Sequence, residues 1–474
     1  MNKIRIVFLL LSLLFFQEVS AQVPSIDTLM KHVKVMASDE FGGRFSGTPN
    51  FERAADYCVA LFEMYGLNKL KHSSIDAYNQ SFQIESNVID ECNLSIITQY
   101  GKKYSLNLGM DFSCRGFTGS GTGLTDVVFC GYGQNKDDYN DYRGVDVAGK
   151  TVILFKSNPP FAAPDSGWGV FSIRRQVQIA KEKGAKAVIF VERPNPSKVQ
   201  KPIGSVAHGL GIHQADMPQF ELDLAWVDTL LDGTRYPLER LDRLTENLKM
   251  PFSLSAKSKV EFSVNANYNS NAQTRNVLGY IEGCDPLLKN EFIIVSAHLD
   301  HVGKQADVVY PGANDNASGV AAVLELARLF SNTESKPKRS LLFVLFSGEE
   351  NGLYGSNFMV KNLPLPKEKI VAMYNMDCIA FGDSIQIGNG LSYPELWNKM
   401  KEIDAKQSRR MVEQTWSGGG ADLTPFHKAG IPGLYVVSRY SYTHLHLPSD
   451  KPETLNKKLF FDVVNLVYQT LLEY

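Results

Sequence analysis

Short apolar segments alternate with helical patterns from Phe262 to the C-terminus, and this alternation limits the possible folds more than any other feature. The sequence predicts strands at Phe292–Ala297, Leu341–Phe346, Ile370–Met376 and Gly433–Val437. It predicts helices between and after them at Gly319–Phe330, Gly352–Asn362, Pro394–Ala405 and Leu455–Leu472. Strands that are apolar throughout and separated by helices are buried on both faces. We therefore expect an α/β fold with a mixed, mainly parallel sheet sandwiched by helices.

The middle of the chain, residues 116–259, has a different pattern. Short predicted strands lie among glycine- and proline-rich turns, with two histidines, His208 and His213, and no dense acidic cluster. Before this block, the sequence predicts two helices and a β-hairpin at Ile26–Ala37, Phe51–Tyr65 and Leu94–Leu108. We expect a β-rich domain at 116–259, with no chemistry of its own, inserted into a domain formed by residues 22–115 and 260–474.

The first 21 residues have the pattern of a signal peptide. Lys3 and Arg5 precede an apolar run from Ile6 to Phe16, and Val19-Ser20-Ala21 form a small-residue cleavage pattern. The run is shorter than the roughly 20 residues that a membrane-spanning helix needs. No later segment has an apolar run of spanning length. We expect an exported protein, periplasmic or secreted, that is not inserted in the membrane after the signal is removed.

Cysteine spacing and net charge exclude several classes of protein. None of the 6 cysteines stands in a CxxC pair, so the sequence has no zinc-ribbon pattern. We expect mainly small buried side chains, with one disulfide as an open alternative. Lys and Arg number 49 against 51 Asp and Glu, a formal charge of −2. This balance excludes a nucleic-acid binder held mainly by phosphate contacts.

Histidines and carboxylates follow the predicted strands of the last region. They stand in His298-Leu299-Asp300-His301, Asn314-Asp315-Asn316, Gly348-Glu349-Glu350, Met376-Asp377 and His444-Leu445-His446. Ligands of open α/β sheets bind beyond the carboxyl ends of the strands. Each residue alone has an ordinary structural explanation, but so many like charges at one edge repel unless a cation lies among them. Imidazole and carboxylate without thiolate suit Zn²⁺ or a similar divalent ion, in numbers that favour two metals.

These motifs together resemble the co-catalytic di-zinc aminopeptidase family, to which the glutaminyl cyclases are more distantly similar. The matching segments are Ser296-Ala297-His298-Leu299-Asp300, Gly312-Ala313-Asn314-Asp315-Asn316-Ala317-Ser318-Gly319, Phe346-Ser347-Gly348-Glu349-Glu350, Asn375-Met376-Asp377 and His446-Leu447-Pro448-Ser449-Asp450. The segments around Ala37-Ser38-Asp39-Glu40 and Gly47-Thr48 resemble that family's N-terminal region. The block 116–259 resembles the protease-associated domain often inserted in such enzymes, notably at Tyr142–Lys150 and Lys183–Ala187.

The resemblance implies a zinc peptidase domain with two Zn²⁺ per chain and a role for each site residue. His298 and Asp377 would bind one ion, Glu350 and His446 the other, and Asp315 would bridge them. Glu349 would be the general base, and Asp300 would hydrogen-bond and orient His298. The implied reaction is hydrolysis of N-terminal peptide bonds in peptides or proteins. Leu445 stands where some relatives have the tyrosine that stabilises the oxyanion, so that donor stays open, with Tyr440 and Tyr442 nearby.

Three alternatives stay open at this point. A glutaminyl cyclase would use one zinc, and a binding protein on a degenerate peptidase fold would have lost ligands. The last ligand could be His444 instead of His446, because residues two apart in an extended segment face the same side. We favour His446, since Pro448 stiffens its turn and Asp450 is expected to orient the imidazole. Side-chain preference, aminopeptidase against dipeptidase activity and the oligomeric state are not predicted.

Overall fold

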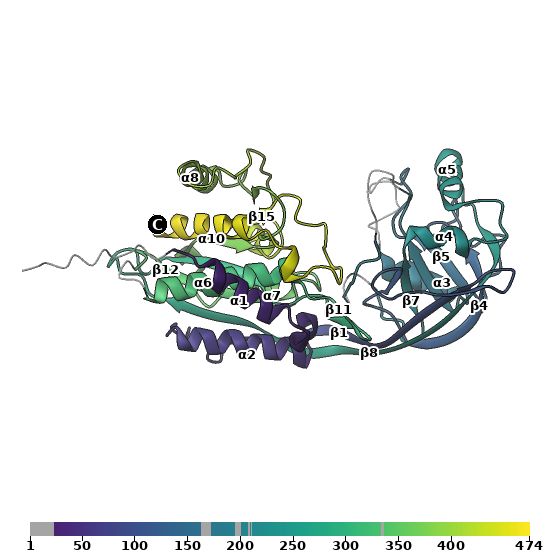
Figure 1. Ribbon diagram of the computed structural model, residues 1–474, viewed down its shortest axis with the longest axis horizontal. Helices are drawn as coiled ribbons and strands as arrows, with labels where there is room; N and C mark the ends of the chain where they lie inside the picture. The colour runs from purple at the N-terminus through teal and green to yellow at the C-terminus, as the bar shows by residue number, and fades with distance from the viewer. Residues whose placement is uncertain (1–22, 163–171, 195–200, 207–208, 210, 333–335) are drawn as a thin grey trace, which may run out of the picture.

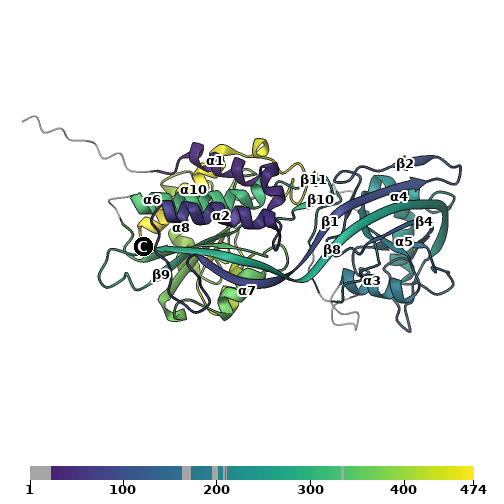
Figure 2. The same ribbon diagram turned by 90° about the horizontal axis from the view of Figure 1, so that it is seen from below.

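Two long strands run through both halves of the molecule. The computed structural model describes residues 23–162, 172–194, 201–206, 209, 211–332 and 336–474, so the predicted signal peptide lies outside the described residues. Strands β1 (Asn79–Ile97) and β8 (Leu254–Ile281) pair antiparallel from Asn79 opposite Val277 to Ile97 opposite Lys259. They connect a larger and a smaller body and make the described strands one 15-stranded sheet (Figures 1 and 2).

The sheet of the larger body is mixed and mainly parallel, which confirms the predicted fold class. Its strand order is β14 (Ile385–Gly388), β15 (Leu434–Ser438), β13 (Ile370–Met376), β9 (Phe292–His298), β12 (Ser340–Phe346) and the C-terminal part of β8. β15, β13, β9 and β12 run parallel, whereas β14 and β8 run antiparallel to their neighbours. β12 is buried along its whole length, as expected for a strand covered on both faces.

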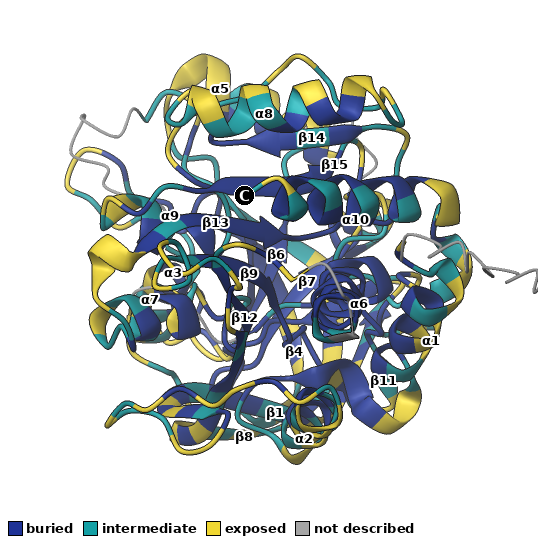
Figure 3. Ribbon diagram, turned by 90° about the vertical axis from the view of Figure 1, so that its left-hand side faces the viewer, coloured by how far each residue is buried: buried dark blue, intermediate teal, exposed yellow. Residues whose placement is uncertain are grey.

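Helices cover both faces of this sheet (Figure 3). On one face lie α1 (Ile26–Met36), α2 (Pro49–Met64), α6 (Ser318–Asn332) and α10 (Lys457–Leu472), with α8 (Pro394–Ala405) packed on α10. On the other lie α7 (Tyr354–Lys361) and α9 (Leu423–Lys428). The helices predicted from apolar spacing are all present, with ends shifted by a few residues. Among the described residues, none of the helices has the length and apolar character needed to cross a membrane.

The smaller body is built on the other ends of β1 and β8. Its remaining strands are β4 (Gly121–Phe129), β5 (Thr151–Phe155), β6 (Ala187–Val191), β7 (Gln219–Leu222) and β3 (Phe112–Cys114), and its helices are α3 (Ile173–Glu182), α4 (Leu224–Leu230) and α5 (Leu238–Leu248). The short β2 (Lys103–Ser105) pairs with the end of β1, which confirms the predicted hairpin. The core of this body also contains Ile89, Leu94 and Phe112, which the boundary at 116 had assigned to the larger domain. The boundary between the two bodies therefore falls inside β1, because this one strand contributes to both of them.

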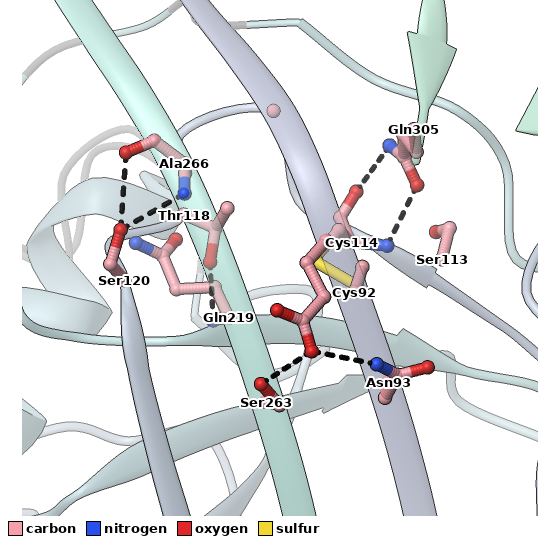
Figure 4. Close-up of a disulfide and its surroundings, with 12 residues drawn as sticks. Cys92, Asn93, Ser113, Cys114, Thr118, Ser120, Gln219, Ser263, Ala266 and Gln305 are labelled. Carbon is pink, nitrogen blue, oxygen red and sulfur yellow. Dashed lines mark hydrogen bonds between the residues drawn. A yellow bond between two sulfur atoms is a disulfide. The ribbon is translucent and has the colours of Figure 1, made fainter. Parts of the chain in front are cut away.

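A disulfide joins β1 to β3 at the base of the smaller body (Figure 4). It links Cys92 to Cys114, while Cys58, Cys130 and Cys378 are buried and unpaired and Cys284 is exposed. Beside it, Gln305 on β10 (Lys304–Gln305) is bonded to Cys114 in both directions. Its Nε2 donates to the Cys114 carbonyl at 2.7 Å, and its Oε1 accepts from the Cys114 amide at 2.9 Å. The loop that follows the His298 strand is therefore attached to the smaller body.

Asp141 is a carboxyl group buried in the smaller body. It is fully shielded from solvent, and its Oδ2 accepts a hydrogen bond from the Gln134 amide at 2.9 Å. Burial raises the pKa of Asp141 to about 8, and hydrogen bonds from Gln134, Tyr132 and Tyr139 only partly offset this effect. The carboxyl group is therefore protonated in the folded protein at a pH where it is ionised in the unfolded chain.

Asp141→Asn should flatten the dependence of stability on pH. Between about pH 4 and pH 8 the folded wild-type protein retains a proton that the unfolded chain has lost, so its stability falls as pH rises, by at most about 1.4 kcal/mol per pH unit. The variant has no such group and should not show this part of the decline. Chemical denaturation at several pH values measures it, with the exposed Asp138→Asn as control. Equal slopes in wild type and Asp141→Asn would contradict this prediction.

Candidate metal centre

The predicted ligands meet at the carboxyl edge of the larger body's sheet. His298 is the last residue of β9, Asp377 directly follows β13, and Glu350 lies in the turn after β12. Asp315 lies in the turn before α6, and His446 lies in the loop after β15. Parallel strands bring their carboxyl ends to one edge, so residues far apart in sequence come together there.

Two groups of donor atoms form around Asp315. In the first, His298 Nε2 lies 3.3 Å from Asp315 Oδ1 and 3.2 Å from Asp377 Oδ1. In the second, His446 Nε2 lies 3.2 Å from Asp315 Oδ2 and 3.0 Å from Glu350 Oε2. The ligand atoms of each group lie within 4.8 Å of one another. Each oxygen of Asp315 faces a different group, which is the arrangement of a carboxylate shared by two metal ions.

The structure adds one histidine that the sequence reasoning did not assign. His301 is fully buried, and its Nδ1 lies 2.8 Å from Glu350 Oε1 and 3.7 Å from Asp315 Oδ2. It belongs to the second group of donor atoms, together with His446. The sequence signal that could have identified it is its position in His298-Leu299-Asp300-His301, three residues after a predicted ligand.

The donor chemistry fits divalent cations such as zinc. Burial alone would raise the pKa of Glu350, but His446 and His301 outweigh it and lower that pKa to about 2. Burial alone would lower the pKa of His298, but Glu349 and Asp377 outweigh it and raise that pKa well above its ordinary value. The buried carboxylates thus require positive charge nearby. Two divalent ions held by imidazole nitrogens and carboxylate oxygens would provide that charge.

The turn that carries Asp315 is fixed by its neighbours in the sequence. Asn314 Nδ2 donates to the Ser441 carbonyl at 3.1 Å, and Asn316 Nδ2 donates to the Met376 carbonyl at 2.9 Å. The peptide bond between Asp315 and Asn316 is cis. A glycine is required at 312, because φ is +59° and a Cβ there would lie 2.2 Å from the Asp315 carbonyl. The Gly312–Asn316 motif is therefore a positioning device for one carboxylate.

Asp450 supports the same turn, and its predicted role was wrong. Its carboxylate accepts from the amides of Asn314 and Asp315, at 2.9 and 3.0 Å. The Nδ1 of His446, which Asp450 was expected to orient, instead donates to the carbonyl of Gly204 at 3.1 Å. Asp450 lies under the Asp315 turn, so its oxygens are occupied by backbone amides.

Asp300 also acts differently from the prediction. Its backbone carbonyl, at 3.0 Å, accepts the hydrogen bond from His298 Nδ1, whereas its carboxylate Oδ1 is 3.9 Å from that nitrogen. The carboxylate accepts from the amides of Glu349 and Glu350, at 3.2 and 3.3 Å. Burial raises the pKa of Asp300 to about 6, against the opposing effect of His298. Asp300 thus fixes both the His298 ring and the turn that carries the two glutamates.

Glu349 has the environment of a proton-transferring group. Among the described residues, its carboxylate makes no hydrogen bond or ion pair that would hold it in place. Burial raises the pKa of Glu349 well above its ordinary value, against the opposing effect of His298, and the neighbouring Asp422 and Glu350 add to the rise. Asp422 is itself buried, and its pKa is raised to about 7, chiefly by burial. A carboxylate that readily takes up a proton beside metal ligands suits a general base.

Tyr435 and Tyr442 form a hydrogen-bonded pair that reaches the ligand Asp377. The hydroxyl of Tyr435 donates to Asp377 Oδ2 at 2.9 Å and is also hydrogen-bonded to Tyr442. The side chain of Tyr440 is 63% exposed. Tyr440 and Tyr442 both lie near His446 in the sequence, and Tyr442 is connected to the metal centre through Tyr435.

An α/β sheet with paired imidazole and carboxylate groups at its carboxyl edge is an arrangement that suits a site for divalent metal ions. Residues 276–471, which contain every predicted ligand, match the sequence model of "Peptidase family M28". The match covers less than half of the chain, and over these residues the chain is similar to that peptidase family.

The sequences of known relatives align with only part of this chain. It is 34% identical over 178 residues to leupeptin-inactivating enzyme 1 of Streptomyces exfoliatus, covering 37% of this chain and 39% of that protein. It is 28% identical over 217 residues to aminopeptidase YwaD of Bacillus subtilis, covering 43% of this chain and 45% of that protein. The matched segments thus span about half of these relatives or less.

Solved structures extend the likeness to both bodies. An aminopeptidase from Aneurinibacillus sp. strain AM-1 superposes with a TM-score of 0.64 at 21% identity, covering 94% of this chain and 93% of that one. A peptidase M28 precursor from Shewanella amazonensis gives 0.62 at 18% identity, covering 94% and 96%. At such identities the likeness concerns the fold alone, and it includes the smaller body.

Replacing His446 and His444 separately by alanine should distinguish a metal ligand from its neighbour. His446→Ala should lose about one zinc per chain, because Nε2 of this ring faces both Asp315 and Glu350. His444→Ala should keep the metal content of the wild type, since its ring hydrogen-bonds Ser449 and contacts Phe381. Metal analysis of the purified proteins measures both. Loss of zinc from His444→Ala with retention in His446→Ala would reverse the assignment.

Proposed function

We propose that the protein is a zinc aminopeptidase that hydrolyses N-terminal peptide bonds of peptides or proteins. The observation that carries the proposal is the shared Asp315, which faces His298 and Asp377 on one side and Glu350 and His446 on the other. These five residues would hold two zinc ions. Bound there, zinc would lower the pKa of a water molecule and polarise the scissile carbonyl.

The protein's own groups supply the remaining chemistry. Glu349 takes a proton from the attacking water and passes it to the nitrogen of the leaving amine. Burial raises the pKa of Glu349 well above its ordinary value, and a carboxylate with a raised pKa accepts a proton more readily. Asp300 holds the Glu349–Glu350 turn at the correct distance from the His298 ring. The names of the relatives, several of them aminopeptidases, support the choice among exopeptidases.

The competing functions fit this arrangement less well. A cyclase with one zinc needs only one of the two groups of donor atoms, whereas both groups are assembled here around a common carboxylate. A binding protein without activity has no use for a free carboxylate with a raised pKa beside the ligands.

Glu349→Gln should separate catalysis from metal binding. Turnover of short peptides with a free N-terminus should fall by about 10²–10⁴-fold, the usual contribution of a general base. The variant should keep its zinc, while Glu350→Gln should lose part of it, because only Glu350 contacts His446. Peptide cleavage with product identification, together with metal analysis, measures both effects. A wild-type protein with two zinc ions that releases no N-terminal residue from any peptide would refute the proposed activity.

We also propose that the protein is exported and that residues 116–259, together with the parts of β1 and β3 that share their core, form a protease-associated domain. The signal-like residues 1–21 support export, and so does the Cys92–Cys114 disulfide, because such bonds persist in oxidising compartments. Expression in a Gram-negative host should yield a mature chain that begins near Gln22 in the periplasm or medium. N-terminal sequencing of the fractionated protein tests this. A cytoplasmic product that retains residues 1–21 would contradict it.

A further inference from the structure

The smaller body contacts the metal centre at one ligand. The amide of Gly204 donates to the carbonyl of His446 at 2.8 Å, and Nδ1 of His446 donates to the carbonyl of Gly204 at 3.1 Å. The opposite ring nitrogen, Nε2, faces Asp315 and Glu350. Gly204 belongs to the inserted block, so this reciprocal pair of bonds joins residues that are 242 positions apart.

The loop that carries His446 has little support of its own. Residues 442–449 are half-buried or exposed, and His446 has a left-handed backbone with φ of +53°. Between residues of the loop, the backbone hydrogen bonds form local turns, such as the bond from the Leu447 amide to the His444 carbonyl at 3.0 Å. A metal ligand on such a loop needs an external contact to fix its ring, and Gly204 provides it.

The segment Pro202–Val206 that carries Gly204 is itself anchored on both sides. Ser113 Oγ donates to the Ile203 carbonyl at 2.9 Å, and the Gly116 amide donates to Ser205 Oγ at 2.8 Å. Ser113 precedes Cys114 of the disulfide, beside the Gln305 contact (Figure 4). Val206 packs in a buried apolar cluster with Phe45, Val302 and Tyr310. The anchors come from both bodies.

The packing around residue 204 leaves no room for a side chain. A Cβ there would lie 2.9 Å from Tyr310 Cε1 and 2.9 Å from Val302 Cγ2, closer than side chains normally approach. Any larger residue would displace the segment from Tyr310 and Val302. Because the carbonyl of Gly204 moves with the segment, the hydrogen bond to His446 Nδ1 would lengthen or break.

We propose that the segment Pro202–Val206 of the smaller body is a positioning element of the metal centre. By accepting the proton of Nδ1, the Gly204 carbonyl selects the His446 tautomer whose Nε2 lone pair is free to bind an ion. This role would give residues 116–259 a part in positioning one ligand, although they are expected to have no chemistry of their own. The nature of the ion rests on the proposed function, but the contact itself does not.

Zinc titration of the metal-free protein tests the proposal. The wild type should bind two ions, and Gly204→Ala should weaken one of them by about 10–100-fold, the usual effect of losing a partner that orients a ligand. Ser113→Ala combined with Ser205→Ala should act in the same direction, because it removes both hydroxyl anchors without touching His446. Excess zinc should restore hydrolysis in Gly204→Ala but not in His446→Ala.

Ser120→Ala is the matched control. Its hydroxyl also makes two hydrogen bonds within the smaller body, both to Ala266, away from the ligands (Figure 4). It should bind zinc as the wild type does, and its circular dichroism spectrum and melting temperature provide the reference for folding. If Gly204→Ala does not fold, the double serine variant decides. Two sites of wild-type affinity in a folded Gly204→Ala, or in the double variant, would overturn the proposal. A wild-type protein without peptidase activity would refute the proposed function. The test of Gly204 would still be valid, because it measures zinc binding and not hydrolysis.

Discussion

The buried guanidinium of Arg44 is the interaction on which the rest of the metal centre depends. It is fully shielded from solvent and donates to the backbone carbonyls of Met36, Leu299, Pro311 and Gly312, at 2.7 to 3.0 Å. Burial lowers its pKa to about 10, against the opposing effect of nearby carboxylates, so it remains charged at neutral pH. One fixed positive charge thus connects α1, the loop after His298 and the turn of Asp315. Removing it would leave these buried carbonyls without a donor, and each buried group left unsatisfied costs about 1–3 kcal/mol.

The loops of the centre are held mainly by backbone groups and not by pairs of ligand side chains. The carboxylates of Asp300 and Asp450 each accept hydrogen bonds from two backbone amides. Gly204 contacts His446 through its peptide group alone. Through a contact of this kind, at Gly204, the smaller body reaches the loop that carries His446.

The sequence predicted the elements that have periodic or local signals. Apolar runs located the strands of the larger body, and the ligands were found because each follows such a strand or precedes a helix. The same reasoning missed the full length of β8, whose alternating polar residues across both bodies do not resemble a single strand. It also misassigned Asp300 and Asp450 and overlooked Gly204 and Arg44. These residues act through contacts with distant segments, and spacing in the sequence carries no record of such contacts.

The β1–β8 ladder has a consequence for how the chain reaches its native state. Its outer end pairs Ile97 with Lys259, so the first contact must close a loop that contains nearly the whole smaller body. For a flexible chain of that length the entropic cost is about 4–5 kcal/mol. If β4 to β7 form first, they bring the two strands together, because β8 pairs directly with β4. The ladder can then extend toward Asn79 and Val277 one pair at a time. The smaller body would in this respect be the template on which the two chain segments of the larger body are joined.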